Sequence, residues 1–338
     1  MKETRFELKR YATCSYLGEF FVSGADLSVA AELKSFGHTI SFHCGFSAVM
    51  ARRQDCGRIL MYHGIVEEGA QALSAQLHFL ARHFKVVSLE TMVNGLANGA
   101  VAKTNEIVLT FDDGLRNNRT VVYPILSELQ IPATFFVCPE MVEKQAWLWN
   151  HEMRCRLKTL TAPVLNDLRM ALLAPGNSAE EIVDWMKTLP LQMRREAEAV
   201  IQQATAGFSP TPAQHAAFDM MNWDDLLSLD SRLINVGSHT MSHPILTTLS
   251  TPEIEAELVE SRRCLEQRLQ RPADLFCYPN GSYDKRVYEV AKRTYRAAVT
   301  TESGVVNQKE GLDLHRLPRI PSADNAALTA WRLHRPEA

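Results

Sequence analysis

Two short polar segments contain the residues best suited to chemistry. Asp112 and Asp113 are adjacent within residues 110–114, and His239 and His243 stand four positions apart within residues 239–244. Two carboxylates and two imidazoles can hold one divalent ion and still leave a carboxylate free. Because a free carboxylate beside a metal-bound water is the basic apparatus of hydrolysis, the two segments together predict a hydrolytic metal site.

The two aspartates directly follow an apolar run over residues 107–111, and Gly114 then permits a sharp turn. Adjacent strand residues face opposite ways, so one carboxylate can reach a metal while the other reaches a water. A hairpin turn is disfavoured, because a helical pattern over 120–129 follows. Helix capping stays open for one of the two aspartates.

The histidine spacing lets both imidazoles approach one ion from a helical or tightly turned loop. Pro244 disfavours helical geometry at His243, so we expect a loop there. A single histidine after a strand is more often structural, whereas two at this spacing favour ligation. For two histidines and one carboxylate zinc is the default ion, and cobalt, nickel and iron also accept these ligands.

Short apolar runs alternate with helical patterns from residue 58 onward. This alternation indicates a parallel sheet with helices outside, and seven or eight such units favour a (β/α) barrel over an open sheet. Active sites of such barrels lie at the carboxyl ends of the strands. We therefore expect both aspartates at the mouth. The expected strands are 59–62, 86–89, 107–111, 133–137, 233–237, 275–278, 297–300 and 317–320.

The stretch 141–221 breaks this rhythm with an almost wholly helical pattern, which predicts a helical insertion at the mouth of the barrel. Trp147 and Trp149 open it and could either stack on a sugar or pack the base of the insertion. Residues 1–57 show no sustained period. The expected organisation is an N-terminal extension over 1–57, a barrel over 58–322 and a C-terminal tail over 323–338.

Bulk composition excludes some classes of function. A formal net charge of −3 gives no electrostatic reason to expect a nucleic-acid partner. No apolar run approaches the roughly 20 residues of a membrane-spanning helix, and the charged N-terminus does not resemble a signal peptide, so we expect a cytoplasmic protein. The seven scattered cysteines indicate reduced thiols.

From residue 58 to 321 the chain resembles the polysaccharide deacetylases of carbohydrate esterase family 4, the NodB-homology domains, and in particular their exopolysaccharide-associated branch. The combination of Thr-Phe-Asp-Asp-Gly and His-x-x-x-His-Pro is highly specific. The resemblance implies a distorted (β/α)7 barrel that removes N-acetyl groups from a saccharide, such as N-acetylglucosamine units. The segments that carry it are 59–63, 110–114, 133–137, 237–244 and 278–284.

The resemblance also implies a role for each motif residue. Asp112 corresponds to the general base. The metal ligands correspond to Asp113, His239 and His243. The family's Arg-x-Pro-Tyr motif maps onto residues 277–280, where the arginine and the aromatic residue are both replaced.

The match to the Arg-x-Pro-Tyr motif implies that Asn280 supplies a backbone N–H to an oxyanion hole. Any residue except proline can fill that role. Tyr278 and Pro279 would form an altered pocket wall. His63, at the end of the first strand, is a further candidate for lining the site.

For the general acid, the nearest match to the family's Leu-x-His segment is His315, which could equally be a surface or strand-edge histidine. The family's arginine that tunes the base has two candidates, Arg316 and Arg319. Two further hypotheses stay open: hydrolysis of another carbon–nitrogen amide, and saccharide binding without turnover.

Overall fold

The computed structural model describes residues 29–100, 105–307 and 311–336, and describes side chains from residue 35 onward. The first half of the unassigned segment 1–57 therefore lies outside the described residues, as do the last two residues of the tail. Within the described part of that segment are two helices, α1 (Val29–His43) and α2 (Phe46–Arg52).

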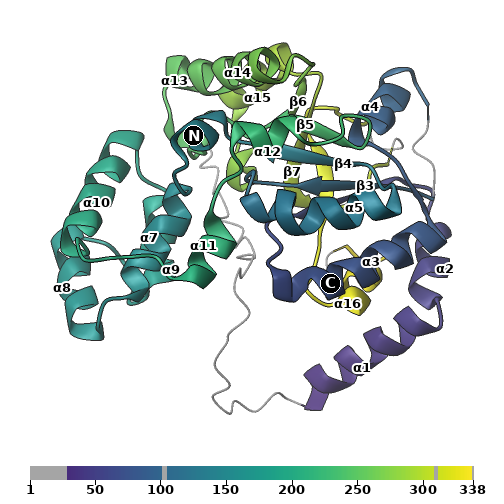
Figure 1. Ribbon diagram of the computed structural model, residues 1–338, viewed down its shortest axis with the longest axis horizontal. Coiled ribbons are helices and arrows are strands. Elements are labelled where there is room, and N and C mark those ends of the chain that lie inside the picture. Colours follow the sequence, from purple (N-terminus) through teal and green to yellow (C-terminus); the bar gives the residue numbers. More distant parts are fainter. Residues whose placement is uncertain (1–28, 101–104, 308–310, 337–338) are drawn as a thin grey trace, which may run out of the picture.

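Seven parallel strands close into a barrel at the centre of the molecule (Figure 1). β1 pairs with both β8 and β3, so the order β1-β8-β7-β6-β5-β4-β3 returns to its start, and β2 adds to the beginning of β3. The (β/α)7 barrel expected from the sequence is confirmed. The strands are β1 (Arg58–Tyr62), β2 (Lys85–Val86), β3 (Glu106–Phe111), β4 (Ala133–Val137), β5 (Ile234–Ser238), β6 (Leu275–Cys277), β7 (Ala297–Ser303) and β8 (Leu317–Pro321).

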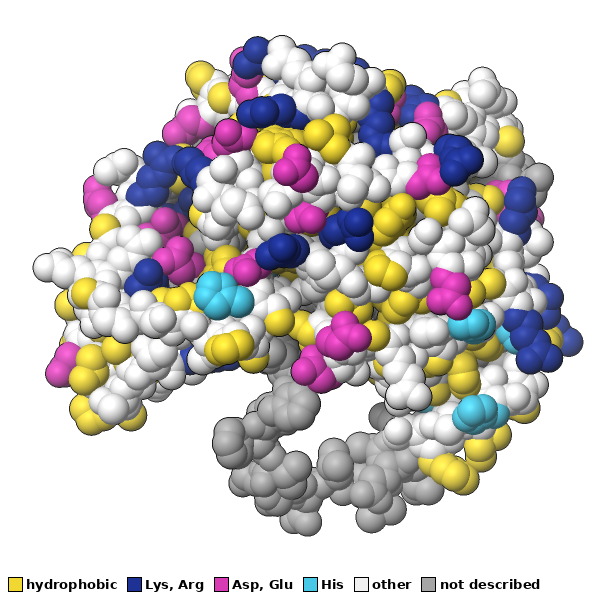
Figure 2. Space-filling view, in the orientation of Figure 1, with side chains coloured by type: hydrophobic (Ala, Val, Ile, Leu, Met, Phe, Trp, Pro, Cys, Tyr) yellow, Lys and Arg dark blue, Asp and Glu magenta, His cyan; other side chains and the backbone are white. Residues whose placement is uncertain are grey.

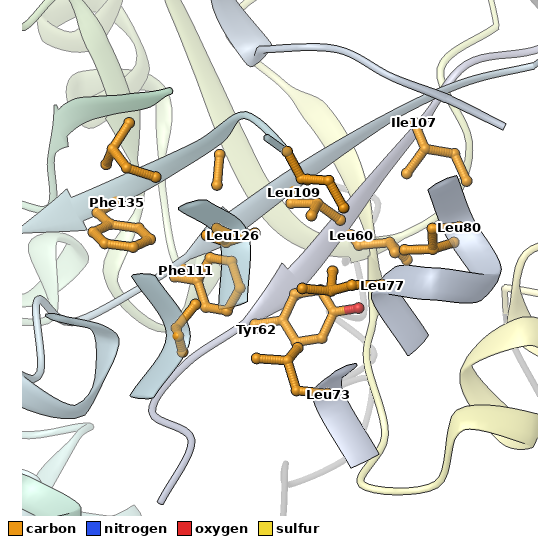
Figure 3. Packing of buried hydrophobic residues seen from close by; sticks show 14 of the residues in the cluster. Leu60, Tyr62, Leu73, Leu77, Leu80, Ile107, Leu109, Phe111, Leu126 and Phe135 are labelled. Atoms are coloured by element: carbon orange, nitrogen blue, oxygen red, sulfur yellow. The ribbon is translucent and has the colours of Figure 1, made fainter. Parts of the chain in front are cut away.

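The barrel strands read as continuous apolar runs because both of their faces are buried. Leu60 and Tyr62 of β1 point outward and pack against helix α3, while Phe111 of β3 stacks on Tyr62 and lies beside Leu126 (Figure 3). Ile59 belongs instead to the cluster that includes Val108 and Cys277. Side chains alternate along a strand, so every second residue lies on the same face. Residues that share a face with Ile59 and Val108, such as Asp112 after β3, therefore point toward the barrel interior.

Helices surround the barrel, and two of them contain a π-helical segment, at Asn118–Val122 before α5 and at Ala256–Glu260 between α13 and α14. The surrounding helices are α3 (Ala70–His83), α4 (Leu89–Ala97), α5 (Tyr123–Leu129), α12 (Trp223–Leu227), α13 (Thr251–Glu255), α14 (Ser261–Leu269), α15 (Lys285–Thr294) and α16 (Ala326–Arg332). Short 3-10 turns lie at Glu67–Gly69, Leu246–Thr248 and Pro279–Gly281.

The segment between β4 and β5 is helical and lies largely to one side of the barrel (Figure 1). Its own apolar core includes Leu157, Ile182 and Ile201. The end of the segment returns to the turn after β3, where the Met221 amide donates to the Gly114 carbonyl at 3.0 Å. The helices are α6 (Pro139–Lys144), α7 (Trp149–Lys158), α8 (Ala162–Leu172), α9 (Ala179–Met186), α10 (Leu191–Ala204) and α11 (Pro212–Phe218).

The N-terminal helix α2 packs into the barrel domain, which the absence of a sequence period did not reveal. Ala48 and Ala51 are fully buried in the main core. The buried guanidinium of Arg58 joins α2 to the end of the chain, because it donates to the carbonyls of Ala51 and Leu333. Residues 46–57 therefore contribute to the folded unit.

No helix among the described residues has the length and apolar character needed to cross a membrane. On the face that Figure 2 shows, basic and acidic side chains of the described residues are interspersed, and they form no continuous basic patch there.

Candidate metal centre

A strained turn at the end of β3 positions the two aspartates. Asp113 and Gly114 both have positive φ angles, of 78° and 77°. A Cβ atom at Gly114 would also lie only 3.0 Å from Val137 Cγ1 of the neighbouring strand. Glycine is therefore required at this position by conformation and by space, and the turn sets Asp112 and Asp113 in different directions.

Asp113 meets both motif histidines. Its Oδ1 atom lies 3.5 Å from His239 Nε2 and 3.5 Å from His243 Nε2. All three side chains are buried, and their ligand atoms cluster within 4.8 Å of one another. Atoms bound about 2 Å from a tetrahedral ion are separated by roughly 3.4 Å. The residues present therefore fit a divalent metal ion.

The loop that carries the histidines is held from several sides. His239 Nδ1 lies 2.8 Å from the Cys277 carbonyl, which leaves Nε2 to face Asp113. Glu257, from the π-helical segment, accepts hydrogen bonds from the amides of Met241 and Ser242. His243 has a φ of 56°, in agreement with the non-helical backbone expected before Pro244.

Asp112 also lies near His239, within 4.8 Å, but its carboxylate forms an ion pair with Arg319. Arg319 Nη1 and Nη2 each lie 2.7 Å from one carboxylate oxygen, and the guanidinium also donates to Thr110 Oγ1 and the Thr300 carbonyl. Burial alone would raise the pKa of Asp112, but Arg319, with smaller contributions from His63 and His239, holds that pKa below its ordinary value. Asp112 is thus kept ionised.

Arg319 occupies the barrel interior beside Cys277. Its Nη2 atom lies 3.2 Å from Cys277 Sγ, so the guanidinium from β8 stands where the family resemblance placed an arginine at position 277. Strand alternation could have favoured Arg319 over Arg316, since position 319 shares a face with buried Leu317.

His63 is the histidine nearest to Asp112. It follows β1, and its Nε2 atom lies 4.0 Å from Asp112 Oδ2. Its side chain is 22% exposed, whereas that of Asp112 is only 2% exposed. Burial lowers the pKa of His63, while the nearby Asp113 and Asp112 carboxylates oppose that change. His63 is therefore a neighbour of both aspartates that solvent or a substrate can reach.

The structure places His315 away from these residues, contrary to its expected role as general acid. It precedes β8, and its Nε2 atom lies 2.9 Å from the carbonyl of Tyr295, a residue just before β7. Both positions lie at the amino ends of strands, opposite to the mouth. Among the described residues, no contact joins His315 to Asp112 or Asp113.

The third motif lies at the carboxyl end of β6 with mixed orientations. Tyr278 is fully buried in the outer layer, where its hydroxyl donates to the His315 carbonyl, so it does not line the mouth as expected. Pro279 is also buried. Asn280 is exposed and has a φ of 55°, and it follows Cys277, whose carbonyl holds His239, by three positions in the sequence.

Two residues of the insertion contact this candidate metal centre. His151 of α7 lies with Nε2 3.4 Å from Asp113 Oδ2, and Trp149 Nε1 donates to the His243 carbonyl at 3.1 Å. The Trp149 ring is 7% exposed and belongs to the insertion core, which favours packing over sugar stacking. Trp147 donates to Asp219 Oδ1 at 2.8 Å. Sequence reasoning missed His151, because it lies in a helix and not at a strand end.

The family model for polysaccharide deacetylases matches residues 100–298. A curated relative, YxkH of Bacillus subtilis, carries a polysaccharide deacetylase name and is 28% identical over 100 residues. That match covers 29% of this chain and only 36% of YxkH, or about a third of its length.

Solved structures share the fold at low sequence identity. The Streptococcus pyogenes deacetylase PplD, in complex with acetate, is 19% identical and superposes with a TM-score of 0.56, covering 84% of this chain and 98% of its own. IcaB from Ammonifex degensii is 17% identical with a TM-score of 0.53, covering 82% and 98%. Both comparisons support the barrel and its arrangement.

Proposed function

Because the chain belongs to the polysaccharide deacetylase family, we propose that it is a metal-dependent hydrolase that removes N-acetyl groups from a saccharide. One observation carries this proposal: Asp113 Oδ1 faces two histidine Nε2 atoms at 3.5 Å, while the adjacent Asp112 is held by two hydrogen bonds from Arg319. Ligands and a separate carboxylate are thereby provided at one barrel mouth.

Asp113, His239 and His243 would hold the ion, for which zinc is the default by ligand type. A bound ion would lower the pKa of a water molecule to about 7 and would polarise the acetamide carbonyl. The imidazole of His239 is already oriented for ligation by the Cys277 carbonyl.

Asp112 is proposed as the general base. The ion pair with Arg319 keeps Asp112 deprotonated, so the carboxylate can accept a proton from the attacking water at neutral pH. The two hydrogen bonds from Arg319 also fix its orientation, so that little reorganisation precedes proton transfer.

His63 replaces His315 as the proposed general acid. Its Nε2 atom lies 4.0 Å from Asp112 Oδ2, so it can receive through one bridging water the proton that Asp112 takes from the attacking water. It can then donate that proton to the nitrogen of the leaving amine, and its partial exposure lets a saccharide reach it. Asn280 is proposed to donate its backbone N–H to the developing oxyanion.

The proposed substrate is an N-acetylglucosamine-type unit of a bacterial exopolysaccharide or cell-envelope glycan. Acetate bound to PplD is consistent with that chemistry, since acetate is the product of deacetylation. Another carbon–nitrogen amide would use the same groups, and a small-amide panel separates the two possibilities. The cytoplasmic location suggested by the sequence stays a prediction.

Acetate release from N-acetylglucosamine oligomers tests the proposal. The purified chain is assayed as prepared, after chelation and after zinc is restored, with Asp112→Asn as the control. We expect release that follows the metal and is lost in Asp112→Asn. Full activity in the chelated protein would refute the role of the metal, and metal binding without release from any oligomer or amide would favour binding without turnover.

A further inference from the structure

Helix α7 of the insertion contacts two of the three residues proposed to hold the metal. His151 Nε2 lies 3.4 Å from Asp113 Oδ2, and Trp149 Nε1 donates to the His243 carbonyl at 3.1 Å. Both residues are buried, with exposed fractions of 8% for His151 and 7% for Trp149. These contacts join an inserted helix to a barrel site.

The two oxygens of Asp113 have separate partners. Oδ1 faces the Nε2 atoms of His239 and His243, and Oδ2 faces His151. A carboxylate that ligates a metal through one oxygen is oriented by a hydrogen bond to its other oxygen. An ionised carboxylate only accepts, so we assign the donating proton to His151 Nε2. The buried Nδ1 atom of His151 has no hydrogen-bond partner, which agrees with that tautomer.

Packing within the insertion fixes both side chains. The His151 ring stacks on Phe218, with ring centroids 4.6 Å apart and an interplanar angle of 20°. Phe218 ends α11, and the next residue, Asp219, accepts a hydrogen bond from the Arg116 amide just after the aspartate turn. The Trp149 ring lies under the guanidinium of Arg194, 4.5 Å from its centroid. Contacts within the insertion therefore fix the orientation of the two side chains that contact the site.

We propose that the helical insertion completes the metal centre, with His151 as a positioning residue that holds the second oxygen of Asp113. This inference rests on the metal site of the proposed function and assigns the insertion a role in it. Loss of such a partner lowers metal affinity by about 10- to 100-fold. Trp149 supports the same site more weakly, because it holds a backbone carbonyl and not a ligand atom.

Three variants of the full-length chain test the proposal. His151→Phe keeps a ring to stack on Phe218 but removes the donor, and His151→Gln retains an amide N–H. Trp149→Phe keeps the ring under Arg194 but removes the indole donor. His78→Phe, at an exposed position on α3, is the control.

Each metal-free protein is titrated with cobalt, and the dissociation constant and the visible absorption spectrum are recorded. We expect the dissociation constant of His151→Phe to rise about 10- to 100-fold. His151→Gln should recover most of the affinity, Trp149→Phe should lose less than His151→Phe, and His78→Phe should match the wild type. The cobalt bands should keep their positions in every variant, because the ligands are unchanged.

Unchanged affinity in a folded His151→Phe protein would overturn the proposal. A shift of the cobalt bands in His151→Phe would also overturn it, since His151 would then be a ligand itself. Circular dichroism checks that each variant is folded, and Trp149→Phe provides the test if His151→Phe is not. A wild-type chain that binds cobalt but releases no acetate would refute the proposed activity and leave this inference standing.

Discussion

Arg319→Met should cost stability through the ion pair that it breaks. Arg319 is fully buried, and its two hydrogen bonds of 2.7 Å to Asp112 are accompanied by bonds to Thr110 and Thr300. Methionine fills a similar length without charge or donors. Removing one partner of a buried ion pair costs about 3–5 kcal/mol, because the other charge is left unpaired. We expect Arg319→Met to lower the free energy of unfolding by that amount at pH 7.5.

The loss should depend on pH with a definite sign. In the wild type, the pKa of Asp112 is held below its ordinary value of 3.8, so the ion pair stabilises the fold above that pH and is lost only as pH falls through the lowered pKa. Without Arg319, burial dominates and raises the pKa of Asp112. The carboxyl of the variant then becomes neutral at a higher pH than that of the wild type, and its penalty shrinks as the pH falls. The difference between variant and wild type should therefore shrink from pH 7.5 to pH 5.

Urea unfolding at both pH values measures this, with two further variants. Arg316→Met is the matched control, because the Arg316 side chain is 49% exposed, and its loss should cost about 1 kcal/mol or less. Combining Arg319→Met with Asp112→Asn should cost less than the sum of the single losses, by about 1–3 kcal/mol. A loss below about 1 kcal/mol for Arg319→Met, additive single losses, or a penalty that grows toward pH 5 would refute the reasoning.

Further predictions concern catalysis, the metal and the turn. His63→Gln should lower kcat about 10²- to 10⁴-fold without changing the amount of bound metal, whereas His315→Gln should leave kcat near the wild-type value. Steady-state kinetics and metal analysis measure both quantities. A larger loss of kcat in His315→Gln would contradict the assignment. Chelation should lower Tm, and zinc at about 100 times its Kd should restore about 2.7 kcal/mol, which calorimetry measures; equal Tm values with and without zinc would oppose a metal site. Gly114→Ala should cost about 1–3 kcal/mol through its positive φ and its contact with Val137, and a melting curve identical to that of the wild type would count against a constrained turn.

The sequence predicted the barrel well, because its strands are buried on both faces. Continuous apolar runs such as 107–111 and 133–137 are typical of parallel strands, and the structure has strands at Glu106–Phe111 and Ala133–Val137. Asp113 and His239 were also accessible to prediction, since the carboxyl ends of parallel strands meet at one mouth. The expected roles of these residues remain predictions that the proposed experiments test.

The remaining site residues depend on tertiary contacts that no local pattern encodes. His315 follows a leucine-rich segment as the family resemblance suggested, but the chain places it before β8 at the wrong end of the strand. His151 reaches Asp113 from within a helix of the insertion, and its spacing to neighbouring residues carries no signal of that contact. The buried helix α2 was missed for a similar reason, because its contacts are to the far end of the chain.

The most direct test counts acetate and free amine in one reaction, as a function of the metal bound per chain. The account predicts that both products form in equal amounts from an N-acetylglucosamine oligomer. Their rate should rise in proportion to bound metal up to one ion per chain, and it should vanish in Asp112→Asn at the same metal content. One ion per chain with neither product, or an Asp112→Asn variant as active as the wild type, would contradict the central claim.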